Sequence, residues 1–240
     1  MQPKAPSTPP KPLSRVWRPE LTRLPGLHRP RRLFRSFVRL LARLLICTLT
    51  RPELRGLEKL PRAAALYVTN HLGDADAPLA LAALPTAPEA LGKIELLFEF
   101  PVLGRVMDWY GTIWLHRGRV DRAALGYAVQ ALRAGRSLII APEGRYTLTG
   151  ALERGTAGAA YVALQAQVPI VPIALTGTRN EEVYASLRRL RRPVVTLTVG
   201  EPFRLHLEAG HGRSLDAATK QIMESIARLL PAEYRGEYPV

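Results

Sequence analysis

Short apolar runs alternate with helical patterns from residue 57 to the C-terminus. This alternation is typical of βαβ units, in which helices packed on a sheet join parallel strands. We therefore expect an α/β fold with a largely parallel central sheet flanked by helices. The expected strands are Ala64–Thr69, Thr112–His116, Ser137–Ala141, Ile170–Leu175 and Val194–Val199. The expected helices are Ala77–Ala83, Asp121–Ala134, Thr156–Gln167 and Leu215–Leu230.

The first 56 residues differ in composition from the rest of the chain. Residues 1–30 are rich in Pro and Arg, so we expect a disordered basic tail with little to bury. They contain no apolar stretch followed by a small-residue cleavage site, so we expect no secretory signal. Residues 31–56 are expected to form an amphipathic helix and a linker, and residues 57–240 a single domain.

The helix expected at 31–50 has a basic face. Arg32, Arg35, Arg39 and Arg43 are spaced by three or four residues and therefore share one side. Apolar residues fill the remainder, but the arginines make the segment too charged to span a bilayer. Two arrangements stay open. The helix lies in a lipid interface with its arginines at anionic headgroups, or it packs on the domain with its arginines in water.

The charge balance restricts the class of partner. The net charge is +14, from 29 Arg and 5 Lys against 20 acidic residues. A surface of this kind favours phospholipid, nucleic acid or an acidic carrier protein. The single Cys47 excludes an internal disulfide framework and a multi-cysteine zinc site. The uncharged run Gly155–Thr178 is interrupted by Gln and Pro, so we interpret it as a helix and a buried strand rather than a membrane span.

The stretch after the first expected strand contains an imidazole and two carboxylates. His71 can take a proton from a hydroxyl near neutral pH. A carboxylate on its other ring nitrogen would hold the tautomer. Asp76 can reach His71 only if His71 lies on a loop before the helix, and Gly73 makes such a turn easy. Asp74 is a competing partner or the N-cap of the helix.

Two further expected strands end in charged residues. Arg117 follows one of them, where its guanidinium can hold a phosphate in a bidentate fork. Glu143 follows the next, between Pro142 and Gly144, and this turn would expose it at the same sheet edge. For each of these residues an ordinary surface or turn position is the competing interpretation.

These blocks, in this order, resemble the glycerophospholipid acyltransferases, most closely the bacterial 1-acylglycerol-3-phosphate acyltransferases. The resemblance extends over about residues 57–238 and identifies 57–240 as an acyltransferase catalytic domain. The matching blocks are Asn70, His71 and Asp76; Gly111, Ile113 and Arg117; Pro142, Glu143 and Gly144; and Val168, Pro169 and Pro172.

The resemblance implies transfer of a fatty acyl group to the free hydroxyl of a lysophospholipid. His71 would be the general base and Asp76 would orient it. The hydroxyl would attack the thioester of acyl-CoA or acyl-carrier protein directly, because no Gly-x-Ser-x-Gly nucleophile is present. No metal and no cofactor is expected, since no cluster has ligand spacing. The implied substrate-binding residues are Arg117, Glu143, Gly144 and Arg145.

The expected acceptor is 1-acylglycerol 3-phosphate, giving phosphatidic acid in phospholipid biosynthesis at the cytoplasmic face of the cell membrane. The expected partner surface is an anionic membrane, contacted by a peripheral or monotopic protein, and not nucleic acid. Two departures from the family leave a different lysolipid acceptor open. The family has Thr-Arg-Ser after Pro-Glu-Gly, whereas Arg145 stands one position early here, and Thr156 replaces a lysine, for which Arg154 could substitute. An acyl-ester hydrolase and a non-enzymatic basic binder of nucleic acid or a membrane surface are the alternatives from other classes.

Overall fold

The computed structural model describes residues 13–118, 120–205 and 211–240. Within them, seven strands form one sheet in the order β1-β7-β6-β2-β5-β3-β4. The strands are β1 (Arg51–Arg55), β2 (Leu66–Thr69), β3 (Glu89–Lys93), β4 (Ile113–Leu115), β5 (Leu138–Ile140), β6 (Ile170–Thr176) and β7 (Val194–Val199). Every neighbouring pair is parallel except β6 and β7. The expectation of an α/β fold with a largely parallel sheet is confirmed.

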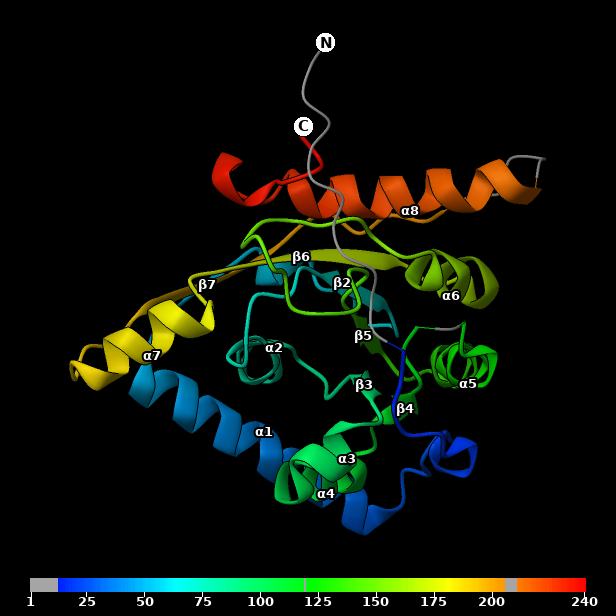
Figure 1. The fold of residues 1–240 in the computed structure, drawn as a ribbon, viewed down its shortest axis with the longest axis horizontal. Helices are drawn as coiled ribbons and strands as arrows, with labels where there is room; N and C mark the ends of the chain where they lie inside the picture. Colours follow the sequence, from blue (N-terminus) through cyan, green and yellow to red (C-terminus); the bar gives the residue numbers. More distant parts are fainter. Residues whose placement is uncertain (1–12, 119, 206–210) are drawn as a thin grey trace.

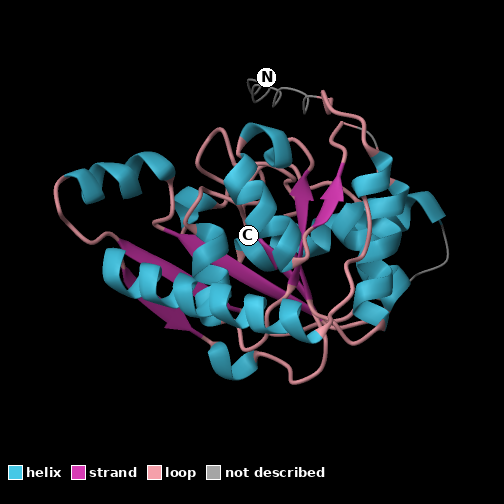
Figure 2. Ribbon diagram, turned by 90° about the horizontal axis from the view of Figure 1, so that it is seen from below, coloured by secondary structure: helices cyan, strands magenta, loops and turns pink. Residues whose placement is uncertain are grey.

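Helices cover both faces of this sheet (Figure 1). They are α1 (Arg29–Leu49), α2 (Asp76–Ala83), α3 (Leu96–Glu99), α4 (Pro101–Tyr110), α5 (Arg122–Arg133), α6 (Gly158–Ala166), α7 (Asn180–Arg188) and α8 (His211–Ala227). Helices α5, α6 and α8 pack on one face, and α1 and α2 lie on the other. Figure 2 shows helices lying across the strands when the molecule is seen from below.

Alternate residues of the central strands divide the core into two clusters. In β2, Leu66 and Val68 pack with α5, α6 and α8, whereas Tyr67 packs with α2. All four residues of β2 are buried. Side chains of successive strand residues point to opposite faces, so a strand covered on both sides must be apolar throughout. This rule explains why β2 and β6 were recognisable in the sequence.

The sequence prediction missed β1, β3, α3, α4 and α7. Strand β1 reads Arg-Pro-Glu-Leu-Arg, which is polar because it is an edge strand paired only with β7. Strand β3 has a buried glutamate, Glu89, whose charge is neutralised by arginines from α1 and from the α5–β5 loop. In both strands, tertiary partners supply what the local sequence pattern lacks.

The basic face of α1 points into the protein. Arg35 is buried and pairs with Glu89 at 2.6 Å between its Nη1 and Oε1. Arg39 and Arg43 donate to backbone carbonyl oxygens at the C-terminal end of α2. Helix C-termini have unpaired carbonyls and partial negative charge, so guanidinium groups stabilise them. The expected arrangements, with these arginines at headgroups or in water, are therefore wrong for Arg35, which is buried, and for Arg39, which is half-buried, whereas Arg43 is exposed and also donates to Ala82.

The apolar side of α1 faces outward as a consequence. Leu33 is 73% exposed and Phe37 is 60% exposed, and five leucines of the same helix are also exposed. Helix α4 packs beside α1, with the rings of Trp109 and Phe34 in edge contact at 5.8 Å. The exposed apolar residues of the two helices, here called the α1–α4 apolar surface, are Leu33, Phe37, Leu40, Leu41, Leu44, Leu45, Leu49, Val102, Leu103, Val106 and Trp109.

The segment before α1 is more ordered than the sequence indicated. Residues 1–12 lie outside the described part of the chain, but Ser14 exchanges hydrogen bonds with Arg117, and Trp17 packs on His116 at 4.6 Å between ring centroids. The predicted disordered tail is therefore too long: from Leu13 onward the chain is held by contacts with the end of β4.

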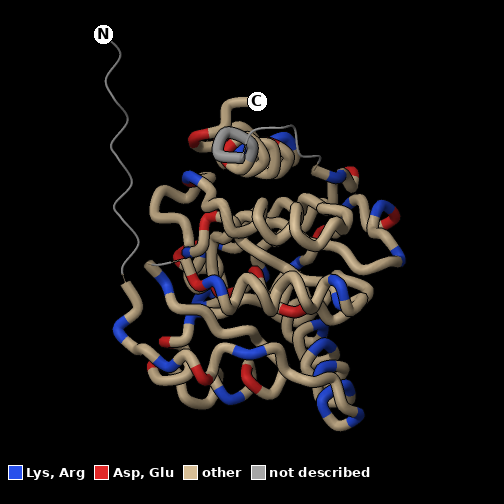
Figure 3. Tube along the Cα trace, turned by 90° about the vertical axis from the view of Figure 1, so that its right-hand side faces the viewer, with Lys and Arg blue, Asp and Glu red and all other residues tan. Residues whose placement is uncertain are grey.

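Basic residues are spread over the molecule. Lys and Arg lie around the whole outline of the view in Figure 3, and they alternate with Asp and Glu on several segments. Several of the arginines that give the high net charge are used internally, as Arg35 and Arg136 are with Glu89.

Candidate active site

His71 and Asp76 meet at the carboxyl end of β2. The His71 Nδ1 and Asp76 Oδ2 atoms are 2.7 Å apart. His71 lies on the loop after β2, and Asp76 is the first residue of α2. The predicted pairing of these two residues, rather than of His71 with Asp74, is confirmed as geometry.

Backbone groups hold Asp76 in place. Its Oδ2 also accepts hydrogen bonds from the N–H groups of Leu72 at 2.7 Å and Gly73 at 3.0 Å. A Cβ on Gly73 would lie 2.4 Å from the carbonyl oxygen of Thr178, so only glycine fits this turn. Because Asp76 is 4% exposed and three nitrogen atoms contact its Oδ2, its carboxyl group is held in one position beside the imidazole.

This arrangement favours one tautomer of the neutral His71 ring. A carboxylate accepts but cannot donate, so the ring proton lies on Nδ1 and Nε2 presents its lone pair. Nε2 makes no hydrogen bond to any residue in the described ranges. The side chain of His71 is 28% exposed, whereas Asp76 is buried. The pair can therefore accept a proton from a hydroxyl that approaches from solvent.

Glu143 fixes the His71 loop from the neighbouring strand. Strands β2 and β5 are parallel neighbours, so the residues after them share one edge of the sheet. Glu143 is 1% exposed, and its two carboxylate oxygens accept from the N–H groups of His71 at 3.1 Å and Glu153 at 2.8 Å. Gly144 has φ 68°, which allows the turn. The geometry supports a positioning role for Glu143.

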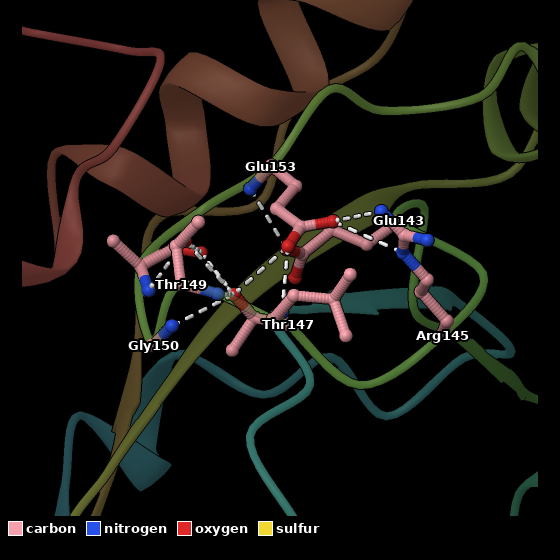
Figure 4. Close-up of polar contacts among 8 residues, drawn as sticks. Glu143, Arg145, Thr147, Thr149, Gly150 and Glu153 are labelled. Atoms are coloured by element: carbon pink, nitrogen blue, oxygen red, sulfur yellow. Dashed lines mark hydrogen bonds and ion pairs between the residues drawn. The ribbon is translucent and has the colours of Figure 1, made fainter. Parts of the chain in front are cut away.

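Arg145 pairs with Glu153 across the following loop (Figure 4). Its Nη2 lies 2.8 Å from Glu153 Oε2, and its side chain is 13% exposed. The other oxygen of Glu153 accepts from the N–H of Leu148 at 2.6 Å. These hydrogen bonds and the Arg145 charge lower the pKa of Glu153 although burial acts to raise it. In this loop it is Tyr146, and not Arg145, that contacts the His71 side chain. The centroids of the two rings are 4.2 Å apart, in an edge contact.

Arg117 follows β4 at the same edge of the sheet. Its guanidinium has no hydrogen bond or ion pair with any residue that the structure describes, and the residue is half-buried. Burial lowers the pKa of Arg117, and the nearby charge of Glu95 acts most strongly against this shift. The backbone of Arg117 is held by Ser14, whose Oγ accepts from the Arg117 N–H at 2.7 Å. A half-buried guanidinium held in this way suits an anionic ligand.

Sequence reasoning missed three further polar residues near His71 and Arg117. Glu95 lies just after β3, with both carboxylate oxygens buried and without a hydrogen-bond partner in the described residues. Its signal was hidden because β3 was not recognised as a strand. Tyr146 and Tyr184 both donate to Asp74, at 2.8 Å and 2.7 Å. Tyr146 could have been found from the sequence, because it is an aromatic residue directly after Pro142-Glu143-Gly144-Arg145.

The described residues contain no group of three His, Cys, Asp or Glu side chains that could hold a metal ion. In the same residues, no helix has the length and hydropathy needed to cross a membrane.

Comparisons with known proteins agree with the geometry. The family model described as "Acyltransferase" matches residues 51–176. A 1-acyl-sn-glycerol-3-phosphate acyltransferase of Limnanthes alba is 29% identical over 191 residues, covering 76% of this chain and 64% of the relative. That of Cocos nucifera is 30% identical over 138 residues, covering 54% and 43%. A lyso-ornithine lipid O-acyltransferase of Pseudomonas aeruginosa is 31% identical over 136 residues, covering 56% and 52%. The chain thus spans between 43% and 64% of the length of these relatives.

A solved structure resembles the whole fold. The crystal structure of the 1-acyl-sn-glycerophosphate acyltransferase of Thermotoga maritima superposes with a TM-score of 0.61 at 19% identity. The match covers 83% of this chain and 81% of that one. At this identity the likeness shows the fold alone.

Proposed function

Because the chain belongs to the acyltransferase family, we propose that it transfers a fatty acyl group from acyl-CoA or acyl-carrier protein to the hydroxyl of a lysophospholipid. Most of the similar relatives are named for 1-acyl-sn-glycerol 3-phosphate, whose acylation gives phosphatidic acid. The observation that supports this most directly is the His71–Asp76 pair, with Nδ1 engaged and Nε2 open at the sheet edge.

The reaction follows from the orientation of the imidazole. Nε2 of His71 takes the proton of the acceptor hydroxyl as its oxygen attacks the thioester carbonyl carbon. Asp76 stabilises the imidazolium that forms. The tetrahedral oxyanion then collapses, the carbon–sulfur bond breaks, and the imidazolium returns its proton to the leaving thiolate. One ester forms and one thioester is lost, so no covalent enzyme intermediate is needed.

Arg117 is the residue we assign to the acceptor phosphate. Its guanidinium is half-buried and available, whereas Arg145 already pairs with Glu153. Glu143 and Gly144 contribute by holding the His71 loop rather than by direct contact with the acceptor. One arginine at the end of β4 and one base at the end of β2 would place the glycerol backbone of the acceptor across the sheet edge.

The α1–α4 apolar surface is the membrane contact in this proposal. A contiguous set of exposed leucines and aromatic rings on two adjacent helices suits burial among lipid chains. This gives peripheral or monotopic attachment, at the cytoplasmic face of the membrane where the acyl donor is made. The acceptor lipid would then reach His71 without leaving the bilayer surface.

A direct assay tests the proposal. The protein is incubated with acyl-CoA or acyl-carrier protein and a panel of lysolipids that includes lysophosphatidic acid and lyso-ornithine lipid, and the products are identified by mass. We expect a diacylated lipid with wild type and none with His71→Ala. Release of fatty acid without an acylated lipid would instead indicate a hydrolase.

A further inference from the structure

Three residues beside His71 form a compact polar group, here called the Asp74 cluster. The hydroxyl of Tyr146 donates to Asp74 Oδ1 at 2.8 Å, and that of Tyr184 donates to Oδ2 at 2.7 Å. Tyr146 comes from the loop after β5, Asp74 from the loop before α2, and Tyr184 from α7. Three separate segments therefore converge on one carboxylate next to the proposed base.

The Asp74 cluster has a negative charge that no described cation neutralises. No Lys, Arg or His in the described residues lies within ion-pair distance of Asp74. The charge of Asp74 raises the pKa of Tyr184 through their hydrogen bond, and it adds to burial in raising the pKa of Tyr146. Both phenols are therefore neutral hydrogen-bond donors to Asp74 at physiological pH.

The cluster is also open to a ligand. Tyr146 is 41% exposed and Tyr184 is 44% exposed, and Asp74 itself is exposed. A carboxylate bordered by two accessible aromatic rings is a favourable site for an alkylammonium group, which gains both ion pairing and cation–π attraction. A phosphate monoester with two charges would be repelled at the same place.

The position of the cluster relates it to the substrate. Tyr146 contacts the His71 ring, with 4.2 Å between the ring centroids. Asp74 and Tyr184 also line a groove of about 170 Å³ whose walls include Leu45 and Leu49 of α1. The cluster thus lies between the proposed base and the apolar helix face that we assign to the membrane.

We propose that the Asp74 cluster binds the ammonium group of a zwitterionic acceptor, a lysolipid that has both a phosphate and a primary amine in its headgroup. This inference rests on the proposed function and narrows its acceptor. Arg117 takes the phosphate and Asp74 takes the amine, on either side of Tyr146. Tyr146 occupies the position where the family has an arginine after Pro-Glu-Gly-Thr. A neutral tyrosine at this position does not repel an ammonium group bound to Asp74, as an arginine would.

Binding measured by calorimetry tests the inference independently of turnover. The ligands are octanoyl lysophosphatidylethanolamine, its N-acetyl derivative and octanoyl lysophosphatidic acid, all used as monomers. Wild type should bind the amine on the order of tenfold tighter than the N-acetyl form, as a cation–π and ion-pair contact provides. Asp74→Asn should abolish this ratio, and Asp74→Glu should restore part of it.

Glu181→Gln is the matched control, because it removes one exposed acidic charge from the same helix as Tyr184 without touching the cluster. Its ligand ratio should equal that of wild type. If wild type binds all three lipids alike, or if Asp74→Asn weakens all three equally, the cluster is structural and the inference is wrong. Acyl transfer to none of the lipids, with the amine preference intact, would overturn the proposed function and leave this inference standing.

Discussion

Two histidines in this chain have the same local arrangement and different surroundings. His71 pairs with Asp76 and His116 pairs with Asp121, each through Nδ1 and each five residues apart. Nε2 of His116 accepts a hydrogen bond from the N–H of Arg18, and its side chain is 3% exposed. His71 is 28% exposed and its Nε2 is open. Burial, rather than the aspartate partner, decides which imidazole can act on a substrate.

The first prediction concerns this base. His71→Ala should lower kcat by about a hundredfold to ten-thousandfold, because proton transfer loses its acceptor. Asp76→Asn should also lower kcat strongly, since the tautomer is no longer enforced. Steady-state kinetics with both variants, and circular dichroism to check folding, provide the measurement. A larger kcat loss in Asp74→Asn than in Asp76→Asn would contradict the assignment.

His116→Ala is the natural comparison for that experiment. Since His116 is buried among Trp17, Asp121 and the N-terminal segment, its loss should appear in Tm rather than in a fall of kcat on the scale of His71→Ala.

The second prediction concerns Arg117. Arg117→Ala should raise the KM for a phosphate-bearing acceptor and leave the donor KM nearly unchanged, because the contact is made in ground and transition states alike. Arg117→Lys should restore only part of the loss, since an ammonium cannot form the bidentate fork. An equal effect on monoacylglycerol and lysophosphatidic acid would show that Arg117 does not recognise phosphate.

At the scale of elements, α1 shows that an amphipathic helix can pack on a domain through its basic side as well as through its apolar side. Arg35 is buried against the carboxylate of Glu89, and Arg39 and Arg43 donate to carbonyl oxygens at the end of α2 from less buried positions. The leucines, which would suit a core in another fold, remain at the surface. Placing the arginines inward follows from the unpaired carbonyls that a short helix such as α2 presents at its end.

The third prediction follows from that orientation. Leu40→Gln combined with Leu44→Gln should release the protein from phospholipid vesicles, because two exposed apolar contacts are lost from the α1–α4 apolar surface. Vesicle sedimentation gives the bound fraction. Tyr161→Gln, which alters an exposed aromatic residue of α6, is the control and should bind as wild type. Unchanged binding of the double variant would assign the membrane contact to another surface.

At the scale of the whole molecule, α1 is part of the domain as well as the surface that we propose for lipid. Glu89 is 0% exposed and receives Arg35 from α1 and Arg136 from the α5–β5 loop. The buried pair links a helix near the N-terminus to strand β3 in the sheet. Removing residues 1–50 would therefore expose α2 carbonyls and leave Glu89 with one partner, so loss of membrane binding by truncation would be confounded by unfolding.

The fourth prediction measures this link. Arg35→Ala should lower the free energy of unfolding by about 3 kcal/mol, because breaking a buried ion pair leaves a charge with incomplete compensation. Arg32→Ala, which removes an exposed arginine one turn before Arg35 in the same helix, should change it by about 0.5 kcal/mol or less. Urea denaturation of both variants gives the values. If the two variants lost the same free energy of unfolding, the ion pair between Arg35 and Glu89 would not contribute to the stability of the domain.

The sequence was enough for the fold class and for the central strands, because β2, β5, β6 and β7 follow periodic rules that operate within a few residues. For His71 the local sequence left Asp74 and Asp76 both open as partners, and the resemblance to the acyltransferases singled out Asp76. The turn at Gly73 that brings His71 and Asp76 together lies against the carbonyl oxygen of Thr178, a contact that the local sequence does not contain.

The tertiary structure decided which partners the charged side chains contact. Glu89 of strand β3 is buried between arginines from two distant segments, and Arg145 pairs with Glu153 across its loop. The direction of α1 depends on carbonyls of α2, some forty residues further along the chain. An arginine can be solvated, paired or hydrogen-bonded at similar free energy. Which partner an arginine contacts therefore depends on the groups that the fold places near its guanidinium. The local sequence pattern does not contain that information.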